Sequence, residues 1–162
     1  MKKIITVIGA LALVIAISSF TFKTVATSTT ADAGGDDIVG LWEPSNGKAR
    51  VKIEKIGTKY YGKIVWLREP VDPDTKKPKV DKNNEDEKMR NVPLRGYRIL
   101  KDFVYDASSK EWSGGTIYDP ESGSLYSCVI TKEGEVLNIR GYVGVKALGR
   151  TDTWKRIKLK KK

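Results

Sequence analysis

Two carboxylates and the single cysteine of the chain lie within residues 116–130, TIYDPESGSLYSCVI, and all three are residue types that can do chemistry. Asp119 and Glu121 could act as a general acid and a general base if they faced one substrate. The residues around these two carboxylates favour a different explanation. Asp119 can accept backbone hydrogen bonds, Pro120 presets φ for a turn, and Gly123 supplies a positive φ. The segment therefore predicts a hairpin with solvated carboxylates rather than a catalytic pair.

The cysteine and the absence of histidine narrow the chemistry further. Cys128 shares a strand face with Tyr126 and Ile130, so we expect a small buried core residue with an inert thiol. The chain has no histidine, which excludes the usual Ser–His–Asp and Cys–His arrangements and removes the commonest zinc ligand. One cysteine forms no intramolecular disulfide. We therefore assign no catalytic residue, no metal site and no cofactor, and we expect a protein that is not an enzyme.

A charged, proline-containing break interrupts the strand-like pattern at residues 69–93. Loops of this length are usually functional lids or mobile surface. Within it, DKNNEDEK at 81–88 places oxygen-bearing side chains at alternate positions, as at the start of a calcium loop. It lacks the glycine at the sixth place and the glutamate at the twelfth, so a charged surface loop is favoured over a calcium site.

The N-terminal residues have the pattern of a secretory signal peptide. Lys2 and Lys3 precede an uncharged, mostly apolar run at 4–22, and small residues follow. We expect an exported protein, periplasmic or secreted; the alternative is an inner-membrane anchor that is not cleaved, for which the run is just long enough. The expected organisation is a signal peptide (1–26, or up to 33), a flexible linker (27–36), one β-barrel domain (37–159) and a basic tail (160–162).

A formal net charge of +10 indicates solubility and a weak attraction to polyanions. Much of it lies in KRIKLKKK at 155–162. This tail is either the solvated end of a last strand or a contact with an anionic lipid, an anionic polymer or nucleic acid. No aromatic residues alternate with its lysines, which disfavours nucleic acid.

Strand-like runs separated by turn signals fill the rest of the chain, at the spacing of an antiparallel sandwich or barrel. The runs are 38–44, 48–57, 59–69, 94–106, 110–120, 123–134, 135–144 and 149–160. In the third run, alternation with Lys63 places Tyr60, Gly62, Ile64 and Trp66 on the inner face. No helix with a 3.6-residue period is apparent after the leader. The fold class we predict is all-β: a single closed antiparallel barrel of about eight strands.

A known family shares this order of motifs. Gly40–Leu41–Trp42, with a cation such as Arg150 or Arg156 near the last strand, resembles lipocalin-like barrels, in which a cation stacks on the indole. The longer series reads DIVGLWEP, YYGKIVWL, DKNNEDEKMRNVPLRGYRIL, EWSGGTIYDPESGSLY, LNIRGYVG and GRTDTWKR. It is similar to the bacterial exported family catalogued as domain of unknown function 2147. The resemblance implies a small exported lipocalin-like barrel and implies no reaction. In the loop, Asn84 and Glu85 follow Asn83 where the family tends to have a proline.

Two binding functions follow. The first is a carrier or sensor of a small, partly apolar ligand inside the barrel. Its expected ligand-binding residues are Tyr60, Ile64, Trp66, Tyr97, Tyr118, Tyr126 and Arg140, with Cys128 as a further inner-wall candidate. Each aromatic residue could instead fill the core, and Trp42, Trp112 and Trp154 are assigned to core or closure. The alternative function is a cell-envelope module that binds an anionic polymer, a lipid head group or a protein through its basic surface.

Overall fold

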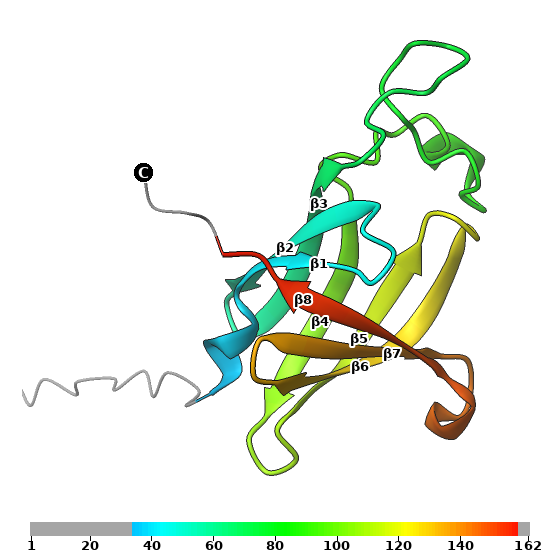
Figure 1. The fold of residues 1–162 in the computed structure, drawn as a ribbon. Helices are drawn as coiled ribbons and strands as arrows, with labels where there is room; N and C mark the ends of the chain where they lie inside the picture. The colour runs from blue at the N-terminus through cyan, green and yellow to red at the C-terminus, as the bar shows by residue number, and fades with distance from the viewer. Residues whose placement is uncertain (1–33, 159–162) are drawn as a thin grey trace, which may run out of the picture.

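The computed structural model describes residues 34–158, which form eight antiparallel strands closed into one barrel (Figure 1). The strands are β1 (Gly40–Glu43), β2 (Ala49–Ile56), β3 (Lys59–Leu67), β4 (Arg98–Asp106), β5 (Glu111–Asp119), β6 (Ser124–Glu133), β7 (Val136–Tyr142) and β8 (Arg150–Arg156). Each strand pairs with the next along the chain, and β8 returns to β1. The all-β fold and the closed barrel are thereby confirmed.

Both ends of the chain lie outside this description. The expected signal peptide, its two cleavage points and the tail 160–162 are not among residues 34–158. The described end of the expected linker packs onto the barrel: Gly35 is buried in the short 3-10 helix η1 (Gly35–Ile38). Residues 35 and 36, which were expected in the linker, therefore belong to η1. Within the described residues, no helix is long and apolar enough to cross a membrane.

The barrel closes at a short seam. β1 contributes only two residue pairs to β8, Trp42 with Arg156 and Glu43 with Lys155. The Arg156 guanidinium lies 4.2 Å from the centre of the Trp42 ring and donates hydrogen bonds to the carbonyls of Val39, at 3.0 Å, and Asp37. It also forms an ion pair with Glu135 at 2.9 Å. The predicted cation on the tryptophan is confirmed, and Arg156 is the residue that supplies it.

Aromatic side chains fill the end of the barrel next to η1. The indole nitrogens of Trp42 and Trp112 donate to the carbonyls of Ile38, at 2.8 Å, and Gly35, at 2.9 Å. Tyr60 meets Trp112 edge-to-face, with ring centroids 6.4 Å apart. These buried donors are therefore satisfied, and η1 acts as a plug for this end.

Two inward glycines make room for the packing. A Cβ at Gly62 would lie 2.7 Å from Leu100 Cδ1, and one at Gly115 would lie 2.5 Å from Phe103 Cδ2. Leu100 and Phe103 are both buried. The barrel end beside η1 is therefore packed too tightly to hold a ligand.

The expected inner face of β3 is correct for Tyr60, Gly62 and Ile64 but wrong for Trp66. In the β2–β3 ladder, Arg50 pairs with Trp66 and Val51 with Ile64, so Val65 is an extra residue. This bulge inverts the alternation, because one inserted residue moves every later side chain to the opposite face. Trp66 consequently points outward, 37% exposed, with the Arg50 guanidinium 4.5 Å from its ring centroid.

A long segment, 68–97, connects β3 to β4 at the other end of the barrel (Figure 1). It contains the 3-10 helix η2 (Glu87–Met89) and two isolated bridges, one of which joins Val80 and Pro93. Asp81 in this segment is buried and accepts a hydrogen bond from the Tyr118 hydroxyl at 2.8 Å. Asn84 Nδ2 donates to the same carboxylate at 2.7 Å. We call this group of Asp81, Asn84 and Tyr118 the latch, because it ties the segment to β5.

Replacing Arg156 tests the seam. Arg156→Ala removes the stacked cation and its bonds to the carbonyls of Asp37 and Val39, so we expect the free energy of unfolding to fall by about 2–4 kcal/mol. Arg156→Lys should recover only part of this, because an ammonium lacks the planar fork. Urea denaturation of each variant measures both. The matched control is Arg98→Ala, which removes a cation 4.8 Å from the outward Tyr61 ring. Equal losses in Arg98→Ala and Arg156→Ala would contradict a special role for the seam.

The latch predicts a local effect. Tyr118→Phe removes one donor from the buried Asp81 carboxylate, which should cost about 1–3 kcal/mol of stability. We expect faster hydrogen exchange in residues 68–97 in particular. Tyr61→Phe is the control, since its hydroxyl donates to the exposed Asp102 at 3.0 Å. If both variants leave the exchange of 68–97 unchanged, Tyr118 does not hold the segment.

Candidate functional site

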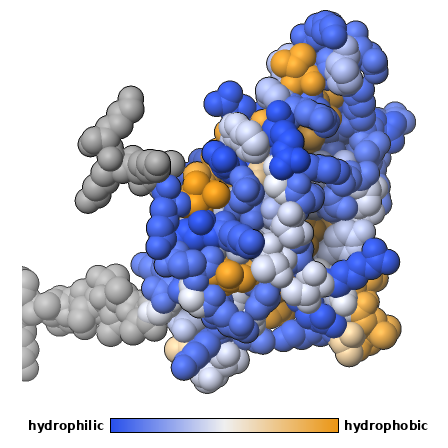
Figure 2. Space-filling view, viewed as in Figure 1, coloured by the Kyte–Doolittle hydropathy of each residue, from blue (hydrophilic) through white to orange (hydrophobic). Residues whose placement is uncertain are grey.

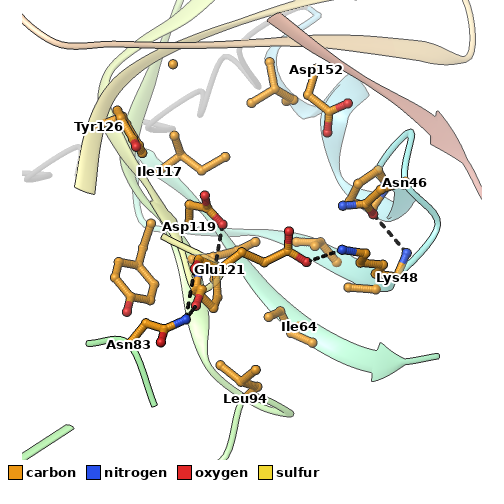
Figure 3. Close-up of a pocket in the computed structure, with 18 of the residues that line it drawn as sticks. Asn46, Lys48, Ile64, Asn83, Leu94, Ile117, Asp119, Glu121, Tyr126 and Asp152 are labelled. Carbon is orange, nitrogen blue, oxygen red and sulfur yellow. Dashed lines mark hydrogen bonds and ion pairs between the residues drawn. The ribbon is translucent and has the colours of Figure 1, made fainter. Parts of the chain in front are cut away.

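A cavity of about 1030 Å³ occupies the half of the barrel away from η1 and continues between the connections at its mouth (Figure 3). Residues of seven strands, β2 to β8, line it together with residues of the connections at the mouth. The apolar lining residues include Ala49, Val51, Ile64, Leu67, Leu94, Ile99, Ile117, Tyr118, Tyr126, Ile139 and Trp154. The apolar part of the lining is thus mostly aliphatic, whereas the filled end is mostly aromatic. A half-open apolar chamber of this size is large enough for a small organic molecule.

Charged and polar residues form the rim. Lys48, in the turn between β1 and β2, reaches across to Glu121 in the β5–β6 turn, with Nζ and Oε1 2.6 Å apart (Figure 3). Asn46 Oδ1 accepts a bond from the Lys48 backbone at 2.9 Å. Both partners of the ion pair are more than half exposed, so the pair contributes little to stability and can separate readily.

The β5–β6 turn is the one that the sequence predicts. Asp119 Oδ1 accepts from the Glu121 backbone at 2.9 Å, and Oδ2 accepts from the Ser122 hydroxyl at 2.9 Å. Gly123 has φ of 74°, and Asp119 pairs with Ser124 across the hairpin. Asp119 is therefore occupied by the turn, and Glu121 by its ion pair with Lys48.

Asp152 adds a carboxylate to the cavity wall. It lies between Arg150 and Trp154 on the inner face of β8, and all three residues line the cavity. Its Oδ2 accepts from the Trp154 indole nitrogen at 2.7 Å, and its Oδ1 from the Thr153 backbone at 2.9 Å. Figure 3 shows it across the cavity from Ile64. The chamber therefore combines apolar walls with a negative group that is held in place.

The latch closes one side of the mouth. Tyr97 packs on Tyr118 with ring centroids 5.4 Å apart, and its hydroxyl accepts from Asn84 at 3.3 Å. Burial raises the pKa of Tyr118, and its hydrogen bond to Asp81 raises it further. Tyr118 therefore remains a neutral donor at any physiological pH. Asn83 adds a second attachment, since its Nδ2 donates to the Glu121 carbonyl at 2.9 Å.

A second anchor lies earlier in the same segment. Asp72 forms an ion pair with Lys82 at 2.5 Å and accepts from the Thr75 backbone at 3.0 Å. The Lys82 ammonium, and then the Thr75 backbone bond, hold the pKa of Asp72 well below its usual range. A carboxyl whose folded-state pKa is lowered contributes stability above about pH 4 and loses it at lower pH. The anchor therefore persists at mildly acidic pH.

Residues 81–88, which resemble the start of a calcium loop, use their side-chain oxygens in hydrogen bonds within the protein. Asp81 faces Tyr118 and Asn84, and Asp86 accepts from the Lys88 backbone at 3.0 Å. Across residues 34–158, no group of three or more Asp, Glu or Cys side chains could hold a metal ion. The role of this stretch in the described structure is to attach the long segment.

The structure places three of the expected ligand-binding residues on the cavity wall: Ile64, Tyr118 and Tyr126. Tyr97 stands behind the wall, against Tyr118. Tyr60 does not line the cavity, because it lies toward the plugged end, where its hydroxyl donates to Asp36 at 2.7 Å. Burial raises the pKa of Tyr60 to about 12. Its inward direction was predicted correctly, but alternation carries no information on depth along the barrel axis.

Trp66 and Arg140 also lie away from the cavity. Trp66 is turned outward by the bulge at Val65. Arg140 lies outside because it grips the β7–β8 connection, donating to the carbonyls of Lys146 and Ala147, both at 2.8 Å. It therefore supports that connection and does not line the cavity in which it was expected to bind the ligand.

Several cavity residues were missed. Val51, Ile99, Ile117, Ile139 and Asp152 line the chamber. For Val51, Ile117 and Ile139 the signal was the period-two alternation of their strands. The sequence indicated Asp152 less clearly. It stands two residues before an inward tryptophan, and so its carboxylate shares that strand face.

The remaining expectations on burial hold, but the place expected for Cys128 on the inner wall of the ligand site is not found. Cys128 is buried in the core and is not part of the cavity lining. Burial raises the pKa of its thiol to about 12, so it is unreactive in the folded protein. Trp42, Trp112 and Trp154 are buried as expected. Trp154 in addition forms part of the cavity wall.

Comparison with known proteins agrees with this geometry. The model of the family described as "Uncharacterized protein conserved in bacteria (DUF2147)" matches residues 40–156. Among solved structures, the chain is similar to protein HP1028 of the human pathogen Helicobacter pylori, described as belonging to the lipocalin family. The TM-score is 0.62 at 24% identity, over 74% of this chain and 82% of that one. This likeness shows the fold alone. No curated protein gives a significant match.

The family match and the barrel have nearly the same limits. The region matched by the family model begins at Gly40, the first residue of β1, and ends at Arg156, the last residue of β8. Trp42 and Arg156, which close the seam, both lie within it. The chain therefore belongs to the bacterial family of domain of unknown function 2147, and its fold is a lipocalin-like barrel of eight strands.

Proposed function

We propose that the protein is an exported carrier or sensor that binds a small, partly apolar molecule inside the barrel. The observation that supports this most directly is the cavity of about 1030 Å³. Proteins rarely leave a large apolar chamber empty, because each void forfeits packing contacts. The open half of this barrel has aliphatic walls where the other half has packed aromatics, so the hollow is a property of the side chains.

The lining indicates an amphipathic ligand. Ile64, Ile117 and Ile139 offer an apolar surface from three separate strands. Polar groups at the rim and Asp152 on the wall could fix the orientation of a polar end. Apolar walls with a few placed polar groups are typical of small-molecule sites.

Binding is favoured over catalysis for this site. The two carboxylates of the β5–β6 turn already have partners, Asp119 in the turn and Glu121 in the pair with Lys48. Asp152 is held by Trp154 and Thr153.

The alternative, an envelope module acting through its basic surface, has less support. Among the described residues, Lys59, Lys63 and Lys146 each form an ion pair with an acidic side chain. Such pairs leave less positive charge for a polyanion.

Filling the cavity tests the carrier proposal. Ile117→Trp places an indole in the chamber, and we expect at least a tenfold loss of affinity for the apolar fluorophore N-phenylnaphthylamine, roughly the effect of losing one good apolar contact. Fluorescence titration gives the dissociation constants. Val104→Trp on the outer face of β4 is the matched control and should bind as the unchanged protein does. Binding that is unaffected by Ile117→Trp would show that the probe is not in the chamber, and would contradict the proposal.

Native mass spectrometry of protein purified from its own host tests occupancy and export together. A carrier should retain a small molecule that is released when the protein unfolds. We propose cleavage of the leader, so the mass should correspond to a chain that begins after Ala26 or Ala33. A full-length mass in the membrane fraction would contradict export as a cleaved protein, and repeated absence of any adduct would count against a resident ligand.

A further inference from the structure

The connection between β7 and β8, residues 143–149, exposes aliphatic side chains at the mouth of the barrel. Val143, Val145 and Leu148 are 74%, 59% and 83% exposed. Figure 2 shows hydrophobic residues gathered at the corner where Figure 1 places the 3-10 helix η3 (Lys146–Leu148). We call Val143, Val145 and Leu148 the tip. Two of them, Val143 and Leu148, also line the entrance to the cavity.

The tip is held in this exposed position by specific contacts. Arg140 donates to the carbonyls of Lys146 and Ala147, both at 2.8 Å, and to the Thr151 hydroxyl at 3.0 Å. The backbone of Leu148 donates to the Val145 carbonyl at 3.1 Å. The connection is thereby organised with its apolar side chains in water, instead of folding them over the open chamber, where they could be buried. A side chain that is kept in water at a cost in hydration free energy indicates a partner surface.

Positive charge lies immediately behind the tip. The Arg140 guanidinium is within the connection, and the exposed Arg150 follows it on β8. Lys146 is part of the connection and forms an ion pair with Glu111 at 3.0 Å. Three cationic side chains and one acidic side chain therefore lie next to the exposed aliphatic tip. Segments that enter the interface of an anionic bilayer have the same arrangement, with apolar side chains outermost and basic side chains next to them.

The size of the tip favours a lipid surface over a protein. A stable protein interface buries about 800 Å² on each partner and includes about 20–30 residues. Three aliphatic residues on one short connection cover far less than that. A bilayer needs no such area, since a few aliphatic side chains with nearby cations can enter the head-group region.

We propose that the tip inserts into the surface of an anionic membrane and so presents the mouth of the barrel to the bilayer. The inference rests on the proposed carrier function for its purpose, because an amphipathic ligand could then pass between the bilayer and the cavity. The docking itself requires only the tip and the cations behind it.

A local fluorescent label tests the docking. In Val145→Cys, an environment-sensitive dye reports the polarity at the tip, and Ile56→Cys, 49% exposed in the β2–β3 hairpin at the plugged end, is the matched control. The native Cys128 is buried, with its thiol pKa raised to about 12, so it does not compete for the label. The full chain is used, and any anchoring by its N-terminus acts equally on the two labelled proteins.

With vesicles of phosphatidylcholine and phosphatidylglycerol, we expect a blue shift of the dye at position 145 and none at position 56. Leu148→Asp in the Val145→Cys background should weaken the partition at least about tenfold, since an aliphatic contact is replaced by a charge that anionic lipid repels. Raising the salt concentration should also weaken it. An unshifted dye at position 145, or equal shifts at both positions, would overturn the proposal.

The two proposals fail separately. N-phenylnaphthylamine binding is measured on the same labelled protein, without vesicles. If the probe binds and the dye at position 145 does not respond, membrane docking is wrong and the carrier function stands. If the dye responds and the probe does not bind, docking stands and the function of the cavity is wrong.

Discussion

The seam between β1 and β8 decides whether this chain has an interior at all. β1 has four residues, and only two of them pair with β8. So short a ladder provides few backbone hydrogen bonds, and the Arg156 side chain supplies the remaining connections through its stack on Trp42 and its bonds to Val39 and Asp37. The seam also explains the glycine of the Gly–Leu–Trp motif. Gly40 has φ of 145°, and a Cβ there would lie 2.5 Å from Arg156 Nη1, so any other residue would both strain the backbone and displace the cation.

Once the sheet is closed, the size of the inward side chains decides where the barrel is filled. Trp42, Tyr60, Phe103 and Trp112 occupy the plugged end together with η1. Toward the mouth the inward positions are mainly valine and isoleucine, which reach less far across a barrel of the same width. The same backbone geometry therefore gives a solid half that supplies stability and a hollow half that is available for binding. A ligand in the hollow half does not need to disturb the packed core.

Sequence patterns predicted the parts of this arrangement that depend on local chemistry. The β5–β6 turn follows from Asp119 and Gly123, and the burial of Cys128 follows from alternation along β6. Trp66 was wrongly placed on the inner face because a single unpaired residue, Val65, inverts the in–out alternation of side chains along β3. The residue types at that point do not indicate a bulge. Tyr60 was correctly expected to point inward, but its depth depends on the tilt and stagger of the strands. Arg140 and the latch depend on how two connections fold back on the barrel, which is a tertiary property.

The two sides of the mouth are held in different ways, and this bears on how a molecule could enter. On the side of the long segment, Asp81 and Tyr118 form a buried hydrogen bond, and separating them would remove one of the two side-chain donors of this buried carboxylate. Between the β1–β2 and β5–β6 turns, the mouth is crossed by the exposed Lys48–Glu121 pair. Water compensates both charges when such a pair opens, so its loss costs little. The contact that a ligand can displace most easily is therefore this ion pair. One side of the rim is therefore firmly attached, and the other can open at little cost. The exposed aliphatic tip also lies beside the opening.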